Sequence, residues 1–165
     1  MTGYVFGAPW AMATKVITVV TIIVVCIPVY IFITLPEGAA WLGCLMVGGP
    51  VLFILTCAGY TIRGYQLDGS SLLIHRLRWT NRLDLVGLKS VDYDPSAMSR
   101  SIRIFGNGGC FSITGWFWNR KLGRYRAFVM DPKRAVVLRF SDYVLVVSPD
   151  QPAKFVVLFR ELHGL

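Results

Sequence analysis

The stretch Val16–Leu35, VITVVTIIVVCIPVYIFITL, determines how the rest of the chain is arranged, because it contains no ionisable side chain over twenty residues. A second uncharged apolar run, Ala39–Tyr60, follows the short connection Pro36-Glu37-Gly38. About 20 helical residues span roughly 30 Å, the thickness of the hydrocarbon core of a bilayer. The two runs therefore predict a hairpin of two transmembrane helices, over residues 16–35 and 39–60.

A cleaved signal peptide is the alternative interpretation of the first run, with Ala39-Ala40 as a weak cleavage site. The apolar core of a signal peptide has about 7–15 residues, which is shorter than this run. A second apolar run also follows almost at once. The pattern therefore favours two membrane spans.

The charged residues predict the orientation of the hairpin. Lys15 and Glu37 are the only Lys, Arg, Asp or Glu residues among the first 60, so the net charge of +8 belongs to residues 61–165. Lys15 precedes the first run and Arg63 follows the second, whereas the connection between the runs has no cation. The positive-inside rule then predicts that both termini lie in the cytoplasm, with residues 1–15 as a cytoplasmic segment whose aromatic side chains lie at the membrane interface.

Small residues in the second run predict how the two helices pack. Ala40, Cys44 and Gly48 recur every four residues, a spacing that lets helices in a membrane approach closely. The sequence Gly48-Gly49-Pro50 predicts a local break in the second helix. Because the runs offer threonines but no ionisable group at mid-depth, the hairpin is predicted to be an anchor and not a transport path.

From Thr61 onward the chain changes to short β-favouring runs separated by turn sequences. The predicted strands lie within residues 61–67, 72–77, 83–93, 101–105, 111–113, 124–130, 135–140 and 143–147. Because no helical run separates them, they predict a mainly antiparallel sheet. The sequence GWFWNRK at Gly115–Lys121 is expected to be an aromatic and basic loop.

One amphipathic helix is predicted at the end of the chain, with Gly164 as its end. Its apolar stripe consists of Phe155, Leu158, Phe159 and Leu162. Ser148–Gln151 has the form of a capping box, with Pro149 at the first helical position, and Asp150 is the alternative cap. The predicted fold class is therefore α+β: a transmembrane hairpin followed, over residues 61–165, by an antiparallel roll or barrel of the pleckstrin-homology (PH) type with one C-terminal helix.

Several sequence segments resemble the bacterial PH-domain-like membrane proteins. They are RIFGNGG at Arg103–Gly109, GWF at Gly115–Phe117, LGRYRA at Leu122–Ala127, RAVVL at Arg134–Leu138, VVSPD at Val146–Asp150, and the opening segments Gly64–Leu67, Leu72–Arg76 and Leu88–Val91. The resemblance covers roughly residues 64–162. It implies a PH-like domain on a membrane anchor in the bacterial cytoplasmic (inner) membrane, and it implies no enzymatic activity.

Aromatic and basic side chains gather in one part of this region. They are Trp116, Trp118, Arg120, Lys121, Arg124 and Arg126. Indole rings prefer the membrane interface and cations attract anionic head groups, so these residues are the predicted lipid contact. The alternative is that the aromatic rings fill the core and the cations form an ordinary solvated face.

The sequence Gly106-Asn107-Gly108-Gly109 admits two interpretations. It has the composition of a backbone nest for phosphate, but it lacks the Lys-Ser/Thr tail and the helix of a P-loop. A tight turn with positive φ angles is the favoured interpretation.

The remaining polar residues give little support to catalysis or metal binding. Asp92 and Asp94 are more typical of loop chemistry than of a metal site, and the cysteines show no metal-ligand spacing. His75 and His163 are the only histidines, and Cys110 has no identifiable basic partner. We therefore expect no metal and no cofactor.

The sequence favours a non-catalytic binding or scaffold module that contacts lipid head groups of the inner leaflet or a membrane partner protein. The alternative is a structural subunit of a homo-oligomer or of a larger membrane complex. A remote third possibility is a small membrane enzyme that acts on lipid substrates, which would need a nucleophile–base pair or clustered carboxylates. The membrane hairpin makes nucleic acid the poorer candidate partner for the basic region.

Overall fold

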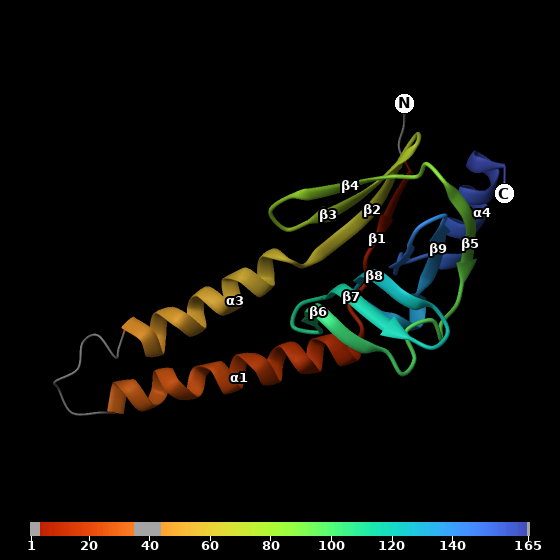
Figure 1. The fold of residues 1–165 in the computed structure, drawn as a ribbon. Coiled ribbons are helices and arrows are strands. Elements are labelled where there is room, and N and C mark those ends of the chain that lie inside the picture. The colour runs from red at the N-terminus through yellow and green to blue at the C-terminus, as the bar shows by residue number, and fades with distance from the viewer. Residues whose placement is uncertain (1–3, 35–43, 165) are drawn as a thin grey trace.

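Two helices extend side by side from one side of a β-structure, and a third helix covers the opposite side (Figure 1). This is a computed structural model that describes residues 4–34 and 44–164. The described strands form a four-stranded and a six-stranded sheet. The α+β class predicted from the sequence is confirmed, with a PH-like arrangement of the strands and the C-terminal helix.

The two neighbouring helices come from the apolar runs. They are α1 (Met12–Thr34) and, after the π-helical turn η1 (Cys44–Gly48), α3 (Gly49–Gly59). Among the described residues, α1 is the one helix long and apolar enough to cross a bilayer, and Leu45–Gly59 is a shorter apolar helix. The predicted break at Gly48-Gly49-Pro50 coincides with the change from π- to α-helix. Helix α1 therefore has the length and composition expected for the first predicted span, and residues 35–43 lie outside the described residues.

The four-stranded sheet contains a strand that precedes the two apolar helices. Its order is β1-β2-β3-β4, and all its pairs are antiparallel. The strands are β1 (Tyr4–Gly7), β2 (Ile62–Asp68), β3 (Ser71–Arg76) and β4 (Thr80–Asp84). The predicted separate segment 1–15 therefore contains a strand of the sheet, and Phe6 packs against Phe155 instead of lying at the membrane interface.

The six-stranded sheet has the order β5-β9-β10-β8-β7-β6. Its strands are β5 (Leu88–Tyr93), β6 (Ile102–Gly108), β7 (Ile113–Asn119), β8 (Gly123–Val129), β9 (Val136–Phe140) and β10 (Val144–Val147). The prediction of a mainly antiparallel sheet is confirmed, with one exception: β10 pairs with β8 in parallel. The intervening chain, which contains β9, is long enough for the crossover that a parallel pair requires.

Two apolar clusters hold the sheets together. The larger lies where both sheets meet the C-terminal helix, α4 (Pro152–His163), and it includes Tyr65, Phe128 and Phe159. The hydroxyl of Tyr65 donates to the carbonyl of Phe128 at 2.7 Å and accepts from the backbone N–H of Ser148 at 3.2 Å. Burial raises the pKa of Tyr65 to about 12, although the bonds to Ser148 lower it in part. This phenol links the two sheets as a neutral group.

The start of α4 differs from the predicted capping box. The N-cap residue is Gln151, which makes no side-chain cap bond, and Pro152 occupies the first helical position. The hydroxyl of Ser148 instead accepts the backbone N–H of Met130 at 2.8 Å, because this serine lies inside the sheet contact. The predicted end at Gly164 is confirmed, since this residue adopts a left-handed conformation at the C-cap.

The N-terminal strand makes a testable contribution to stability. Replacing Phe6 with alanine removes its edge contact with Phe155, at a ring distance of 5.0 Å, and leaves a gap in the core. We expect Phe6→Ala to lower the free energy of unfolding by about 3 kcal/mol, the lower end of the range for a core phenylalanine. Denaturant unfolding of the full chain in detergent micelles measures this loss.

The neighbouring Val5, which is 69% exposed, supplies the matched control. Val5→Ala on the outer face of the same strand is expected to change stability little. Equal effects of the two substitutions would contradict the placement of β1 in the domain.

Candidate functional site at the junction of helices and sheets

Helix α1 is fixed to the β-structure through two threonines one helical turn apart. The hydroxyl of Thr14 donates to the carbonyl of Met130 at 3.0 Å, and the hydroxyl of Thr18 accepts the backbone N–H of Phe111 at 2.9 Å. Both threonines are buried. The Thr14 bond holds the first turns of the helix against the residue that follows β8, and the Thr18 bond holds them against the connection between β6 and β7.

Helix α3 is fixed through the connection between β3 and β4. Arg76 donates from Nη1 to the carbonyl of Tyr60 at 3.0 Å and from Nε to Asn81 Oδ1 at 2.7 Å. Its guanidinium also lies over the rings of Tyr60 and Trp79, 5.1 and 5.5 Å from their centroids. The backbone N–H of Leu77 donates to the carbonyl of Thr61 at 3.1 Å. The tip of this strand pair is therefore attached to the C-terminal end of α3.

A pocket of about 660 Å³ lies between these two attachments. Both helices and strands β3, β6, β7 and β8 contribute to its wall. Its side-chain lining includes Ile17, Thr21, Phe53, Thr56, Tyr60, Arg76, Arg103, Phe105, Trp116, Arg126 and Phe128. A pocket of this size is typical of small-molecule sites.

The wall formed by β6 and β7 depends on two facing glycines. Gly106 and Gly115 have φ angles of +121° and +136°, and a Cβ on either would lie about 2 Å from a backbone oxygen of the other strand. Only glycine allows the two strands to approach this closely. Gly108 leaves room for a neighbouring side chain, because a Cβ there would lie 2.6 Å from Nη1 of Arg103.

The predicted turn at Gly106–Gly109 does not present free amides. Gly106, Asn107 and Gly108 belong to β6, and the turn follows them. Oδ1 of Asn107 accepts the backbone N–H groups of Gly109 and Cys110 at 3.2 and 3.1 Å. A phosphate nest needs these donors free, so the geometry is that of a tight turn closed by its own asparagine.

The aromatic and basic stretch is a strand and not the predicted loop. Phe117 points into the core and is 5% exposed, whereas Trp116 and Trp118 lie on the other face of β7. Trp116 lines the pocket together with Arg126. Arg124 lies over the ring of Trp116, 4.6 Å from its centroid. The structure thus brings part of the predicted lipid contact together on one sheet face.

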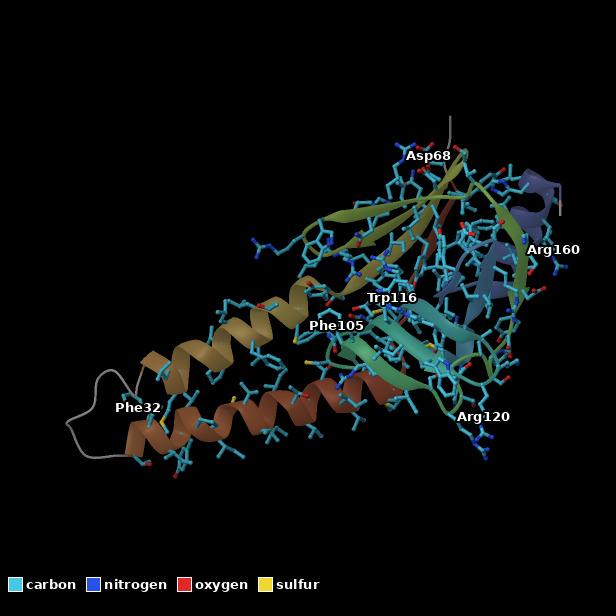
Figure 2. All side chains as sticks on the ribbon, viewed as in Figure 1. Phe32, Asp68, Phe105, Trp116, Arg120 and Arg160 are labelled. Atoms are coloured by element: carbon cyan, nitrogen blue, oxygen red, sulfur yellow. The ribbon has the colours of Figure 1, made fainter. Side chains whose placement is uncertain are left out.

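Arg120 and Lys121 lie elsewhere, at the turn between β7 and β8. Figure 2 shows Arg120 at the end of the sheet away from Phe105 and Trp116. Lys121 forms an ion pair with Asp94 at 2.5 Å and donates to Ser96 at 3.0 Å. Although burial raises the pKa of Asp94, hydrogen bonds from Lys121 and Ser96 hold it below its usual value. The contact of Arg120 and Lys121 with lipid head groups remains a prediction.

The predicted helix-packing stripe is described only in part. Ala40 lies outside the described residues, and Cys44 begins the π-helical turn. A Cβ on Gly48 would meet no atom within 4 Å, so no close approach takes place at this residue. Tight packing along the stripe remains a prediction.

The acids and histidine considered for chemistry have structural partners. Asp92 accepts from Arg160 at 2.9 Å and from Ser90 at 3.1 Å. Both ring nitrogens of His75 are within 3.0 Å of a side-chain oxygen, on Thr80 and Gln66. Asp92 thus links β5 to α4, and His75 bonds within the four-stranded sheet.

Three residues of the junction were not identified from the sequence as part of a site. Arg76 and Arg103 line the pocket, and Trp79 packs on Tyr60 with a ring distance of 5.2 Å. The exposed sequence Leu77-Arg78-Trp79 has the aromatic and basic composition of a membrane-interface turn, which was an available signal. Arg103 carried no such signal, because only the fold brings it into the same pocket as Arg126.

Two packed sheets and a C-terminal helix define a PH-like module. Two apolar helices adjoin it, with the basic pocket at the junction. A family model described as bacterial PH domain matches residues 63–162, and the chain belongs to this family, as its resemblance predicted. Membership indicates a binding or scaffold module, since PH domains are generally non-catalytic. No curated protein and no solved structure matches the chain.

The bond between Thr18 and the β6–β7 connection can be tested directly. Thr18→Val keeps the shape of the side chain but leaves the N–H of Phe111 without this partner. We expect the opening free energy of that amide to fall by about 1–3 kcal/mol. Hydrogen–deuterium exchange of peptides spanning residues 108–115 would show the faster exchange.

Thr21→Val is the matched control, because the Thr21 hydroxyl donates to Ile17 in its own helix. Its effect on exchange of this segment should be small. Unchanged exchange in Thr18→Val would contradict the attachment of α1.

Proposed function

We propose that the protein is a membrane-tethered, non-catalytic binding module. In this proposal, α1 and the helical segment ending in α3 cross the bacterial cytoplasmic membrane as a hairpin. The PH domain is held on the cytoplasmic surface, where the face next to the helices contacts anionic lipid head groups of the inner leaflet.

The observation that supports the hairpin is the register of β1 and β2. Gly7 and Gly64 are directly paired, so the chain leaves the sheet before α1 and returns to the same place after α3. A chain that crosses the membrane in α1 must then cross it again before Ile62. Lys15 and Arg63, at the two ends of this excursion, favour the cytoplasmic side for the domain.

The face of the domain next to the helices has a composition suited to a membrane surface. At the tip between β3 and β4, Leu77 and Trp79 are 44% and 40% exposed and flank Arg78. On β6, Ile104 and Phe105 are 53% and 77% exposed. Figure 2 shows Phe105 beside the helices. Exposed apolar and cationic side chains at this level support contact with head groups.

A role in assembly is the second candidate, supported by the same strand. β6 is the edge of the six-stranded sheet, and an apolar edge strand is a template for pairing with another chain. This alternative places a second copy or another membrane protein on β6.

The proposed topology can be tested by labelling single cysteines in a chain whose four native cysteines are replaced by alanine. An impermeant maleimide added to spheroplasts should label Gly38→Cys, between the two apolar runs. It should reach Asp68→Cys, at the end of β2, only after the membrane is permeabilised. Labelling of Asp68→Cys in intact spheroplasts would contradict a cytoplasmic domain.

Contact with head groups is tested by hydrogen–deuterium exchange of the full chain in nanodiscs. In anionic nanodiscs, we expect slower exchange over residues 77–79 and 102–106 than in zwitterionic ones, and the difference should shrink at high salt. Helix α4, which lies on the side of the β-structure opposite α1 and α3, serves as the internal control and should not change (Figure 1).

Protection that is independent of lipid charge and salt but rises with the number of chains per disc would instead support assembly. Equal exchange in both lipids at one chain per disc would contradict contact with anionic head groups.

A further inference from the structure

The pocket at the junction has one apolar wall, formed by the helices, and one cationic wall, formed by the strands. Its apolar wall comes from the helices, through Ile17, Thr21, Phe53 and Thr56. The hydroxyls of Thr21 and Thr56 donate to carbonyls of their own helices, at 2.8 and 2.7 Å, so these side chains leave a mainly apolar wall. The opposite wall consists of strands that carry cationic side chains.

The charge of the pocket has one sign. Its lining includes Arg76, Arg103 and Arg126 and contains no Asp or Glu. Among residues 4–34 and 44–164, the ion pairs involve Lys121, Arg134 and Arg160, and none of the three pocket arginines.

Two of the guanidinium groups contact the same aromatic ring. Arg76 and Arg126 lie over the same Phe128 ring, 5.1 and 4.8 Å from its centroid, so their Cζ atoms are no more than about 10 Å apart. Burial lowers the pKa of Arg76, and the charge of Arg126 lowers it further, against a raising effect of Tyr60. An anion between these cations would relieve their repulsion.

Arg76 is positioned before any ligand arrives. Its bonds to the carbonyl of Tyr60 and to Asn81 fix the guanidinium, and the residue as a whole is 7% exposed. Arg103 on the edge strand is exposed and lies over Gly108. Guanidinium groups match the oxygens of phosphate in pairs, which makes phosphate the anion best suited to this wall.

We propose that the junction pocket binds one anionic phospholipid of the inner leaflet. The head-group phosphate lies among Arg76, Arg103 and Arg126, and the acyl chains lie against Ile17 and Phe53 and continue into the bilayer. The site is composite, because the PH domain supplies the cations and the membrane helices supply the apolar wall. The proposal rests on the membrane tether of the proposed function.

The test uses the purified full chain in detergent micelles, with lipid binding counted by native mass spectrometry. Phosphatidylglycerol is the anionic probe and phosphatidylcholine the zwitterionic one. We expect the chain to hold one phosphatidylglycerol with at least tenfold preference. Arg103→Gln and Arg126→Gln should each weaken this binding about tenfold or more, the range for a lost hydrogen bond to a charged group.

Arg120→Gln is the matched control, since it removes the same charge from the far end of β7. It should change binding by less than twofold, and all three variants should keep the unfolding midpoint of the wild type. Equal weakening by all three substitutions, absence of a one-lipid complex, or equal binding of the two lipids would overturn the proposal.

A competition experiment with a water-soluble phosphate ester distinguishes binding of the whole lipid from binding of its head group alone. Free sn-glycerol 3-phosphate, added at the concentration of the lipid, should not displace phosphatidylglycerol, because it has no chains to contact the helices. Equal competition would overturn the lipid assignment. If cysteine labelling gives the expected topology while these binding results fail, the composite site is wrong and the tether stands.

Discussion

The pairing of β1 with β2 is the constraint on which the rest of the structure depends. Four residues before the first helix share a register with the strand after the second, so the apolar helices form an excursion from within a sheet. The domain therefore includes chain on both sides of the helices, and the family match, which begins at residue 63, covers only the later part. A helix pair entered from two neighbouring strands restricts the orientation of the domain relative to the helices more than a single linker would.

Because the helices are held in one orientation, a pocket of defined composition forms at the junction between the helices and the sheets. Thr14 and Thr18 attach one helix to the connections of the larger sheet, and Arg76 attaches the other helix to the tip of the smaller sheet. The space left between the attachments is lined by apolar helix residues on one side and by arginines on the other. Arg76 contributes to both features, since the guanidinium that holds Tyr60 also lines the pocket.

Hydrophobic patterns within short stretches of sequence predicted the helices and most strands. They could not predict pairing between strands that are far apart in the chain. The uncharged run identified α1, and the stripe of Phe155 and Phe159 identified the buried face of α4. The four-residue strand β1 has too few residues to show a period, and its partner lies beyond both helices. The sequence Trp116-Phe117-Trp118 was interpreted as a loop because a short aromatic run does not show which ring faces the core. The arginines of the pocket come from three separate strands, so no spacing along the chain could group them.

A cross-strand disulfide in native membranes tests the central claim most directly. Val5 and Gln66 are direct partners on β1 and β2, at a separation suited to a disulfide once both are replaced by cysteine in a chain without native cysteines. The account predicts that Val5→Cys/Gln66→Cys forms an intramolecular disulfide under mild oxidation, whereas Val5→Cys/Arg160→Cys does not. Failure of the first pair to cross-link in a folded chain would contradict a sheet whose strands β1 and β2 pair across the two apolar helices.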